Sequence, residues 1–398
     1  MRSIPACFAA FPRLVVFILI GATYPAQAGN RLILEFTDSV DGPAFARALG
    51  LCVLDEARDG HLVLIEDPGE DALLRLESCA GPGSPLIGIE ADLRVQAQGT
   101  RSQSFIDKLP MARSFWDQPA ASLIQARNGD PLPPAATGTT VAVLDTGVDP
   151  DHPLLKASLV GGGYDFIDDD DTPTDVTTGI DTDGDGLADE ALGHGSHASG
   201  LVLLVDPAAA LLPFRVLDSD GQGSLFDLIQ AIDAAVEGGA GVITMSLGME
   251  EPSDLLEECV NSARAAGCVL VAAAGNTGDD TVLYPAAFSS VLAATASDLD
   301  DVVLGSSSYG YAIDLLAPGA ELLSAHPGGG WLTRSGSSMA AALVAGAAAF
   351  IREQVAGDAT RTEQALLEGA IDVTEENPDK AGLIGEGRLD VLAAEQSL

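Results

Sequence analysis

Two short segments carry a carboxylate and an imidazole that could act together as an acid–base pair. Asp145 directly follows the apolar run 141–144 and precedes a Thr-Gly turn, so its carboxylate is expected at the carboxyl end of a strand. A turn-forming Asp beside Gly is the structural alternative. His194 stands between two glycines and is one of only five histidines in the chain. This setting favours His194 as a general base.

A third segment offers a nucleophile. Ser338 lies in Ser-Gly-Ser-Ser-Met-Ala at 335–340, just before the uninterrupted helical stretch 341–351. A serine in that position can act simply as a helix N-cap. The start of a helix also presents amide groups and a positive dipole to a developing anion, which is what an acyl-transfer site requires.

The three segments, in this chain order, resemble the motifs of the subtilisin-like serine proteases, or subtilases. Residues 143–148 (VLDTGV) resemble the aspartate motif of the family. Residues 194–197 (HGSH) resemble its histidine motif, and 336–340 (GSSMA) its serine motif, each with Ser in place of the usual Thr. The resemblance implies a serine-type endopeptidase that works through an acyl-enzyme intermediate.

Roles for individual residues follow from this resemblance. His194 would take the proton of Ser338 as the hydroxyl attacks a peptide carbonyl, and Asp145 would orient the imidazole and stabilise its cation. His197 would be the structural histidine of the motif and not a second base. The catalytic set implied by the family therefore contains Asp145, His194 and Ser338.

The resemblance extends over roughly residues 100–395 and implies a substrate-binding region. Residues 245–248 resemble the edge strand that pairs with an extended substrate backbone, and 273–276 resemble the segment with the oxyanion-hole asparagine. Asn276, with the Ser338 amide, is thus the expected donor to the tetrahedral oxyanion. The implied substrate-binding residues are Ser246, Leu247, Gly248, Ala274 and Gly275.

Two residues depart from the family pattern after the serine motif. Ala342 and Leu343 stand where the family usually has Pro and His. Pro suits a first helical turn because its missing amide is unpaired there anyway, so we expect a less pre-organised nucleophile but an active enzyme. The departure motivates an alternative function, a catalytically silent calcium-dependent binding protein on the same scaffold. An aspartic protease would need a second Asp-Thr-Gly, and an esterase Gly-x-Ser-x-Gly; the sequence has neither.

A long acidic insertion separates the aspartate and histidine motifs. Its segment 181–190 (DTDGDGLADE) follows the first nine positions of an EF-hand calcium loop, although position twelve is Leu192 instead of Glu. A truncated calcium loop is therefore expected, with a merely solvated acidic loop as the alternative. Its expected ligands are Asp181, Asp183, Asp185, Leu187, Asp189 and Glu190.

The elements that must position these residues indicate an α/β fold. Apolar runs of strand character at 141–144, 211–216, 242–245 and 269–273 alternate with helical patterns at 224–237 and 253–266. Helices of that length suit crossover connections, so we expect a mostly parallel sheet with helices on both faces. Ligands of such sheets bind beyond the carboxyl ends of the strands, and the chemistry is expected there.

A small α+β domain precedes the large one. Its expected elements, in the order βαββαβ, are 31–36, 43–49, 51–54, 61–65, 70–79 and 86–95. That order is the ferredoxin-like arrangement, and the family resemblance implies an inhibitory and folding-assisting propeptide at 29–100. The catalytic domain would then cover 101–398. Residues 97–134 are polar and irregular, so they predict an exposed, cleavable linker, with maturation between Ala97 and Phe115.

The amino terminus predicts export. Arg2 and Arg13, the apolar run 14–22 and Ala-Gln-Ala at 26–28 have the form of a cleaved signal peptide over residues 1–28. A membrane anchor would need about 20 uninterrupted apolar residues. We expect a monomer secreted to the extracellular space or periplasm. The four cysteines outside the signal peptide would then be in an oxidising compartment. Disulfides between Cys52 and Cys79 and between Cys259 and Cys268 are possible there but not required.

The overall charge limits the partners. The chain of 398 residues has 59 acidic against 19 basic residues, a formal net charge of −40. This excludes a nucleic-acid binder, which needs clustered Lys and Arg, and is compatible with calcium binding, salt tolerance or solubility. The expected partners are protein or peptide substrates and the protein's own propeptide.

Overall fold

The computed structural model describes residues 28–66, 68–69, 73, 76, 79, 84–97, 104–105, 114–126 and 136–398. The chain divides into two compact units, Met1–Asp92 and Leu93–Leu398. Nearly all of the predicted signal peptide and most of the predicted helix 70–79 lie outside the described residues.

The small unit contains an antiparallel sheet, the α-helix α1 and the short 3₁₀ helix η1. Its strands lie in the order β4-β1-β3-β2, and their succession agrees with the predicted βαββαβ order as far as the described residues go. The side chain of Asp41 caps α1 by accepting a bond from the amide of Ala44. Alternate residues of the strands, such as Leu32 and Leu34, form the core. The elements are β1 (Ala28–Phe36), α1 (Gly42–Ala48), β2 (Val53–Ala57), η1 (Arg58–Gly60), β3 (Leu62–Glu66) and β4 (Leu86–Ala97), of which 93–97 belong to the large unit.

The large unit is built on a seven-stranded parallel sheet. The strand order is β14-β13-β12-β10-β6-β8-β7, and each neighbouring pair is parallel. This confirms the predicted fold class. The strands are β6 (Thr140–Asp145), β7 (Tyr164–Asp165), β8 (Ala210–Arg215), β10 (Val242–Met245), β12 (Val269–Ala273), β13 (Leu292–Ser297) and β14 (Leu315–Pro318).

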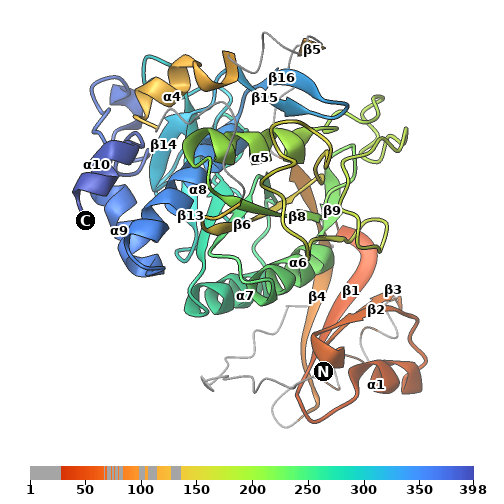
Figure 1. Ribbon diagram of the computed structural model, residues 1–398. Helices are drawn as coiled ribbons and strands as arrows, with labels where there is room; N and C mark the ends of the chain where they lie inside the picture. Colours follow the sequence, from red (N-terminus) through yellow and green to blue (C-terminus); the bar gives the residue numbers. More distant parts are fainter. Residues whose placement is uncertain are drawn as a thin grey trace. The chain divides into compact units, whose positions relative to one another are not determined.

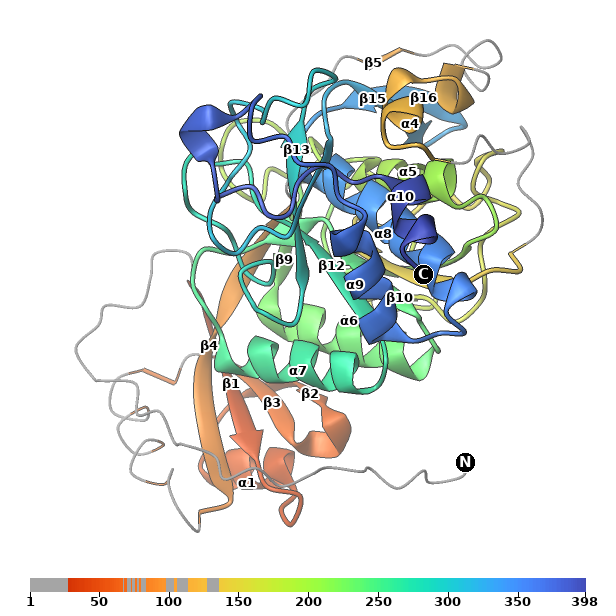
Figure 2. The ribbon, with the colours of Figure 1, turned by 90° about the vertical axis from the view of Figure 1, so that its left-hand side faces the viewer.

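Helices cover both faces of this sheet, as Figures 1 and 2 show. Helices α5 (His194–Val205) and α8 (Ser337–Gln354) pack against each other on one face, and both are rich in small buried residues. Helices α6 (Leu225–Glu237) and α7 (Asp254–Ala265) lie on the other face, each capped by a serine. Helices α9 (Ala359–Glu368) and α10 (Val391–Gln396) pack on α8. Both predicted crossover helices are therefore confirmed.

Short elements complete the large unit. They are β5 (Ser104–Phe105), α4 (Pro119–Leu123), β9 (Gln222–Ser224), β11 (Leu247–Gly248), β15 (Leu322–His326), β16 (Gly330–Arg334) and η2 (Pro378–Lys380). The predicted exposed linker is wrong for its second part, because Phe115, Trp116 and Ile124 are buried in the main core. The reason is tertiary packing, since the ring of Phe115 packs on those of Trp116 and Trp331.

The cysteines of the described residues form no disulfide. Cys52, Cys79, Cys259 and Cys268 are all free thiols, so neither possible pairing is present. The thiol of Cys268 instead donates to the carbonyl of Ala240. Within the described ranges no single helix has the length and apolar character to cross a bilayer; only α8 and α9 taken together do, with a bend of 119° between them.

Candidate active site

Three adjacent strands of the sheet end at the same edge and deliver the polar residues of the site. Asp145 is the last residue of β6, Ser246 follows β10 directly, and Asn276 lies just beyond β12. Because β12, β10 and β6 are neighbours and parallel, their carboxyl ends meet. The candidate residues therefore gather at the edge where a parallel sheet is expected to bind its ligands.

Asp145 and His194 form a buried pair. Nδ1 of His194 lies 2.7 Å from Oδ1 and 2.9 Å from Oδ2 of Asp145, and each residue is 1% exposed. The amide of Thr146 donates to the same Oδ1 at 2.7 Å. The carboxylate therefore fixes the tautomer with a proton on Nδ1, which leaves Nε2 as an acceptor. Nε2 is buried and has no hydrogen-bond partner in the described part of the chain.

A glycine lets the histidine segment approach the aspartate loop. A Cβ on Gly195 would lie 2.2 Å from the carbonyl oxygen of Gly147 and 3.1 Å from Cβ of Asp145. Any larger residue at position 195 would push α5 away from β6. Gly195 therefore allows the backbones of the two segments to come close.

Ser338 sits in the first turn of α8. Its hydroxyl donates to the carbonyl of Ser246 at 3.2 Å and is fully buried. Gly336, the residue before the helix, has φ 141°, a conformation that favours glycine. The sharp turn at Gly336 directs the chain into α8 beside the ends of β10 and β12, and α8 packs along both strands.

Asn276 is held by the same turn. Its Oδ1 accepts the amide of Ser337 at 3.0 Å, and the hydroxyl of Ser337 accepts the amide of Gly275 at 3.2 Å. The amide nitrogen Nδ2 of Asn276 is buried and lacks a partner among the described residues. An unpaired buried donor costs about 1–3 kcal/mol, which makes it a candidate for pairing with a ligand oxygen.

The predicted substrate edge pairs with a strand of the chain itself. In β4, Ala97 faces Leu247 and Gln96 faces Gly248, antiparallel to β11. The other side of the same segment pairs with β9, where Arg94 faces Ser224. An extended backbone therefore lies between β9 and β11, with Ala97 one residue before the level of Ser246. This is the pairing predicted for a peptide substrate, although β9 was not predicted.

In the described structure Ala274 and Gly275 bond to other parts of the large unit and not to residues 94–97; the amide of Ala274 donates to the carbonyl of Ala294 in β13. The carbonyl of Ala274 accepts from Leu283 and that of Gly275 from Ser308. Their place is instead beside Leu283, whose side chain fills the space a Cβ on Gly275 or Gly248 would need.

His197 is separate from the pair. Its Nε2 lies 2.9 Å from the carbonyl of Leu322, and burial lowers its pKa well below the usual value. A neutral, bonded imidazole of this kind ties α5 to β15. Its predicted structural role agrees with this geometry.

Asp175 is a residue of the site that the sequence analysis did not predict. It is 4% exposed and lies between the aspartate and histidine motifs. Burial, with the charge of Asp145 adding to it and the bond from Gly193 opposing it, raises its pKa to about 7. No sequence signal separates Asp175 from the other acids of the insertion, because only the folded chain buries it.

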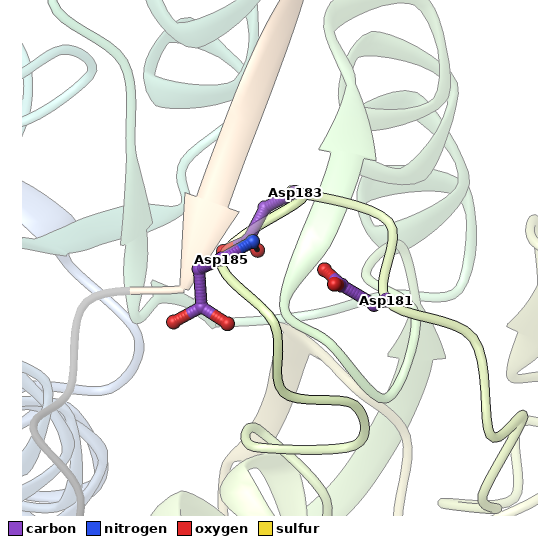
Figure 3. Close-up of side chains that lie close together, drawn as sticks. All are labelled: Asp181, Asp183 and Asp185. Carbon is purple, nitrogen blue, oxygen red and sulfur yellow. Dashed lines mark hydrogen bonds between the residues drawn. The ribbon is translucent and has the colours of Figure 1, made fainter.

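Part of the predicted calcium loop is brought together. Asp181, Asp183 and Asp185 lie on one exposed loop (Figure 3), and their carboxylates have oxygen atoms within 4.8 Å of one another. Asp189 turns elsewhere: its carboxylate accepts the amides of Thr178 and Gly179.

The arrangement of the described carboxylates fits a calcium site only in part. Oxygen atoms are the ligands that calcium prefers, and the three clustered aspartates occupy positions one, three and five of the loop. Each also accepts a backbone amide of the loop, including those of Gly184 and Gly186 on Asp181. Asp189 is bound by the hydroxyl of Ser219 as well, which lowers its pKa. Glu190 is not a member of this cluster of acidic side chains.

Known proteins share this sequence pattern. Residues 136–385 match the model of the Subtilase family. A thermophilic serine proteinase of Bacillus sp. (strain AK1) is 39% identical over 219 residues, which cover 55% of this chain and 53% of that protein. Thermitase of Thermoactinomyces vulgaris is 35% identical over 246 residues, covering 59% and 82%.

A similar fold occurs in a solved structure. Fervidolysin from Fervidobacterium pennivorans, a keratinolytic enzyme related to subtilisin, superimposes with a TM-score of 0.75 at 22% identity. The superposition covers 94% of this chain and 62% of fervidolysin. The match thus spans a little over half of the Bacillus proteinase and of fervidolysin, and most of thermitase.

Proposed function

The chain belongs to the subtilase family of serine-type endopeptidases, and from that premise we propose that it is a secreted enzyme that cleaves proteins through an acyl-enzyme intermediate. The observation that carries the proposal is the state of three atoms at one sheet edge. Asp145 holds Nδ1 of His194, which leaves Nε2 as a base without a partner in the described structure. The amide of Asn276 is likewise an unpaired donor beside Ser338.

The proposed first step is attack by Ser338. Its hydroxyl turns from the carbonyl of Ser246 towards the substrate, and Nε2 of His194 takes its proton. Catalytic hydrogen bonds often tighten only when substrate binds, so the present bond to Ser246 is compatible with this role. Asp145 stabilises the imidazolium, which then protonates the leaving amine.

The tetrahedral oxyanion is proposed to lie at the N-terminus of α8. Nδ2 of Asn276 and the amide of Ser338 would donate to it, in a setting from which water is largely excluded. Because Oδ1 of Asn276 is fixed by Ser337, the donor needs no reorganisation during the reaction. Helix α8 remains regular through Ala342 and Leu343, so the loss of the usual Pro and His does not favour the silent-scaffold alternative.

The small unit is proposed to be a propeptide. Residues 94–97 occupy the groove edge between β9 and β11 that a substrate would use, which supports inhibition until cleavage. The strand runs from Gln96 opposite Gly248 to Ala97 opposite Leu247. Ser246, the residue before Leu247, has its carbonyl bonded to the hydroxyl of Ser338. We therefore expect the maturation cut just after Ala97, at the start of the predicted interval and not near Phe115.

Calcium is proposed as a structural ion at Asp181, Asp183 and Asp185. Bound there, it would supply no chemistry beyond fixing the loop that leads to His194. The protein is further proposed to act as a monomer on unfolded or flexible protein segments that can add a strand to β11.

Expression of the wild type and Ser338→Ala, followed by amino-terminal sequencing, tests the proposal. We expect the mature wild type to begin within a few residues after Ala97, and the variant to remain full length apart from signal removal. Processing of Ser338→Ala at the same bond in a protease-deficient host would contradict self-cleavage by Ser338.

A further inference from the structure

A buried carboxylate joins the two motif segments of the site. Oδ1 of Asp175 accepts the amide of Gly193, the residue before His194, at 3.0 Å. Oδ2 accepts the hydroxyl of Thr146, the residue after Asp145, at 3.2 Å, and that of Ser196 at 3.2 Å. One side chain from the acidic insertion therefore contacts both segments that carry the catalytic pair.

The two hydroxyls are directed by their own acceptor bonds. Thr146 Oγ1 accepts the amide of Gly195 at 3.0 Å, and Ser196 Oγ accepts the amide of Asp149 at 2.9 Å. Each hydroxyl thus accepts one hydrogen bond from a backbone amide and donates one to Asp175. The result is a closed set of bonds between the loop 145–149 and the turn 193–196, which only an acceptor at position 175 completes.

We propose that Asp175 is a positioning residue, which holds the His194 turn on the Asp145 loop so that Nε2 of the imidazole faces Ser338. The inference rests on the proposed function. The bonds of Asp175 go to the two motif segments and not to the nucleophile or the oxyanion donors, so it acts through the alignment of the pair. A displacement of about 1 Å at such a site is enough to reduce turnover about 10²-fold.

The burial of Asp175 makes this role depend on pH. The ionisable groups on the surrounding elements are Asp145 on β6, Arg334 on β16, and His194 and His197 on α5. Because burial raises the pKa of Asp175 to about 7, the carboxyl is largely protonated near pH 6 and ionised near pH 9. The ionised carboxylate of Asp175 accepts hydrogen bonds from the hydroxyls of Thr146 and Ser196. The protonated acid must itself donate a hydrogen bond at one of its oxygens.

Asp175→Asn tests the inference because the amide resembles the protonated acid in shape and charge. A fluorophosphonate that labels Ser338 serves as the probe, and its maximal inactivation rate kinact and its KI are measured across the pH range. At about pH 9 we expect kinact to fall about 10- to 100-fold with KI unchanged, and near pH 6 we expect the two proteins to converge. Asp171→Asn, an exposed acid of the same insertion, is the matched control and should behave as wild type.

A fixed loss of kinact that is equal at both pH values would show a merely structural effect and overturn the inference, as would an unchanged kinact. If Asp175→Asn does not fold, Ser196→Ala and Ser196→Thr provide the second test. Threonine keeps the hydroxyl that bonds Asp175, so it should retain kinact, while alanine should lose about tenfold; equal rates in both would overturn the inference. Absence of labelling in the wild type would instead refute the proposed function.

Discussion

At the scale of single residues, the site is defined by which polar atoms are satisfied and which are not. Asp145 satisfies one nitrogen of His194, and Ser337 satisfies the oxygen of Asn276. The other polar side-chain atoms of these residues, Nε2 of His194 and Nδ2 of Asn276, are buried and unpaired within the described structure. Since buried polar atoms are normally bonded, these two unpaired atoms suit a ligand that both accepts and donates.

Asn276→Ala should lower kcat by about 10²- to 10³-fold with little change in KM, which is the range known for removal of the oxyanion-hole asparagine of subtilisin. The physical reason is that the amide bonds the oxyanion of the transition state more strongly than the ground-state carbonyl. Steady-state kinetics on an unfolded protein substrate measure this. Asn276→Asp, which keeps the acceptor but removes the donor, is the matched variant. A rise in KM alone would contradict the assignment.

The burial of Asp206 should make the free energy of unfolding depend on pH. It is the C-cap of α5, 3% exposed, and burial, followed by the charge of Glu353, raises its pKa to about 7. An acid whose pKa is raised on folding loses stability as the pH increases from its unfolded value towards its folded value. Asp206→Asn should therefore gain in Tm relative to its parent between about pH 4.5 and pH 8, by an amount equivalent to at most about 4 kcal/mol.

Calorimetry in a Ser338→Ala background, which prevents autolysis, measures this difference. Asp171→Asn removes an equal charge from the surface and should show no such trend. A difference in Tm that stays constant with pH would refute the assignment to Asp206.

The proposed catalytic residues could be identified from the sequence because their motifs are local. Asp145, His194 and Ser338 each follow or begin an element whose apolar pattern is visible, and the element fixes where the side chain lies. Asp175 could not be predicted, because its role depends on burial against Thr146 and Gly193, residues up to 29 positions away. The same holds for Asp189, whose loop position suggested a calcium ligand but whose carboxylate caps other loop amides.

At the scale of elements, the acidic loop is proposed to link ion binding to His194. The cluster of Asp181, Asp183 and Asp185 concentrates negative charge on one exposed turn, and the loop is followed directly by the turn into α5. A cation there would relieve the repulsion and order the segment. Without it, this stretch should be among the first parts of the large unit to open.

A chelator should therefore lower the Tm of the Ser338→Ala protein, and added calcium should restore it. The double substitution Asp181→Asn with Asp183→Asn should abolish the response, since the stabilisation by a ligand that binds only the folded state grows with the logarithm of its affinity. Glu375→Gln with Glu376→Gln, an exposed pair elsewhere, is the control and should respond as the parent does. An unchanged Tm of the parent in chelator would contradict a calcium site in the loop.

Among the elements, the central strands and crossover helices were predicted well because their apolar runs are long and regular. The segment 114–126 was not, because its few apolar residues are separated by polar ones and the helix α4 is short. Its burial follows from tertiary packing of Phe115 on Trp331. Strand β9 was missed for a similar reason: Gln222-Gly223-Ser224 has no strand pattern and is extended only because it pairs with β4.

At the scale of the whole molecule, the large excess of acidic over basic residues, most of it after Ala97, should influence which substrates arrive fastest. A field of one sign raises the encounter rate of oppositely charged partners, and salt screens it over about 10 Å at 0.1 M. We expect kcat/KM for a lysine-rich peptide to fall with added salt more steeply than for a neutral peptide with the same residues at the scissile bond. Equal salt dependence of the two peptides would show that the surface charge serves solubility alone.

Activation of Ser338 by His194 is the central claim about this protein. The most direct measurement is intact-mass and peptide analysis of the mature protein after reaction with a fluorophosphonate. We predict one phosphonyl group per molecule, located on Ser338, with no labelling of Ser338→Ala and strongly slowed labelling of His194→Ala. A folded wild type that takes up no label, or a label that persists in Ser338→Ala, would contradict the claim and favour a catalytically silent protein on the same scaffold.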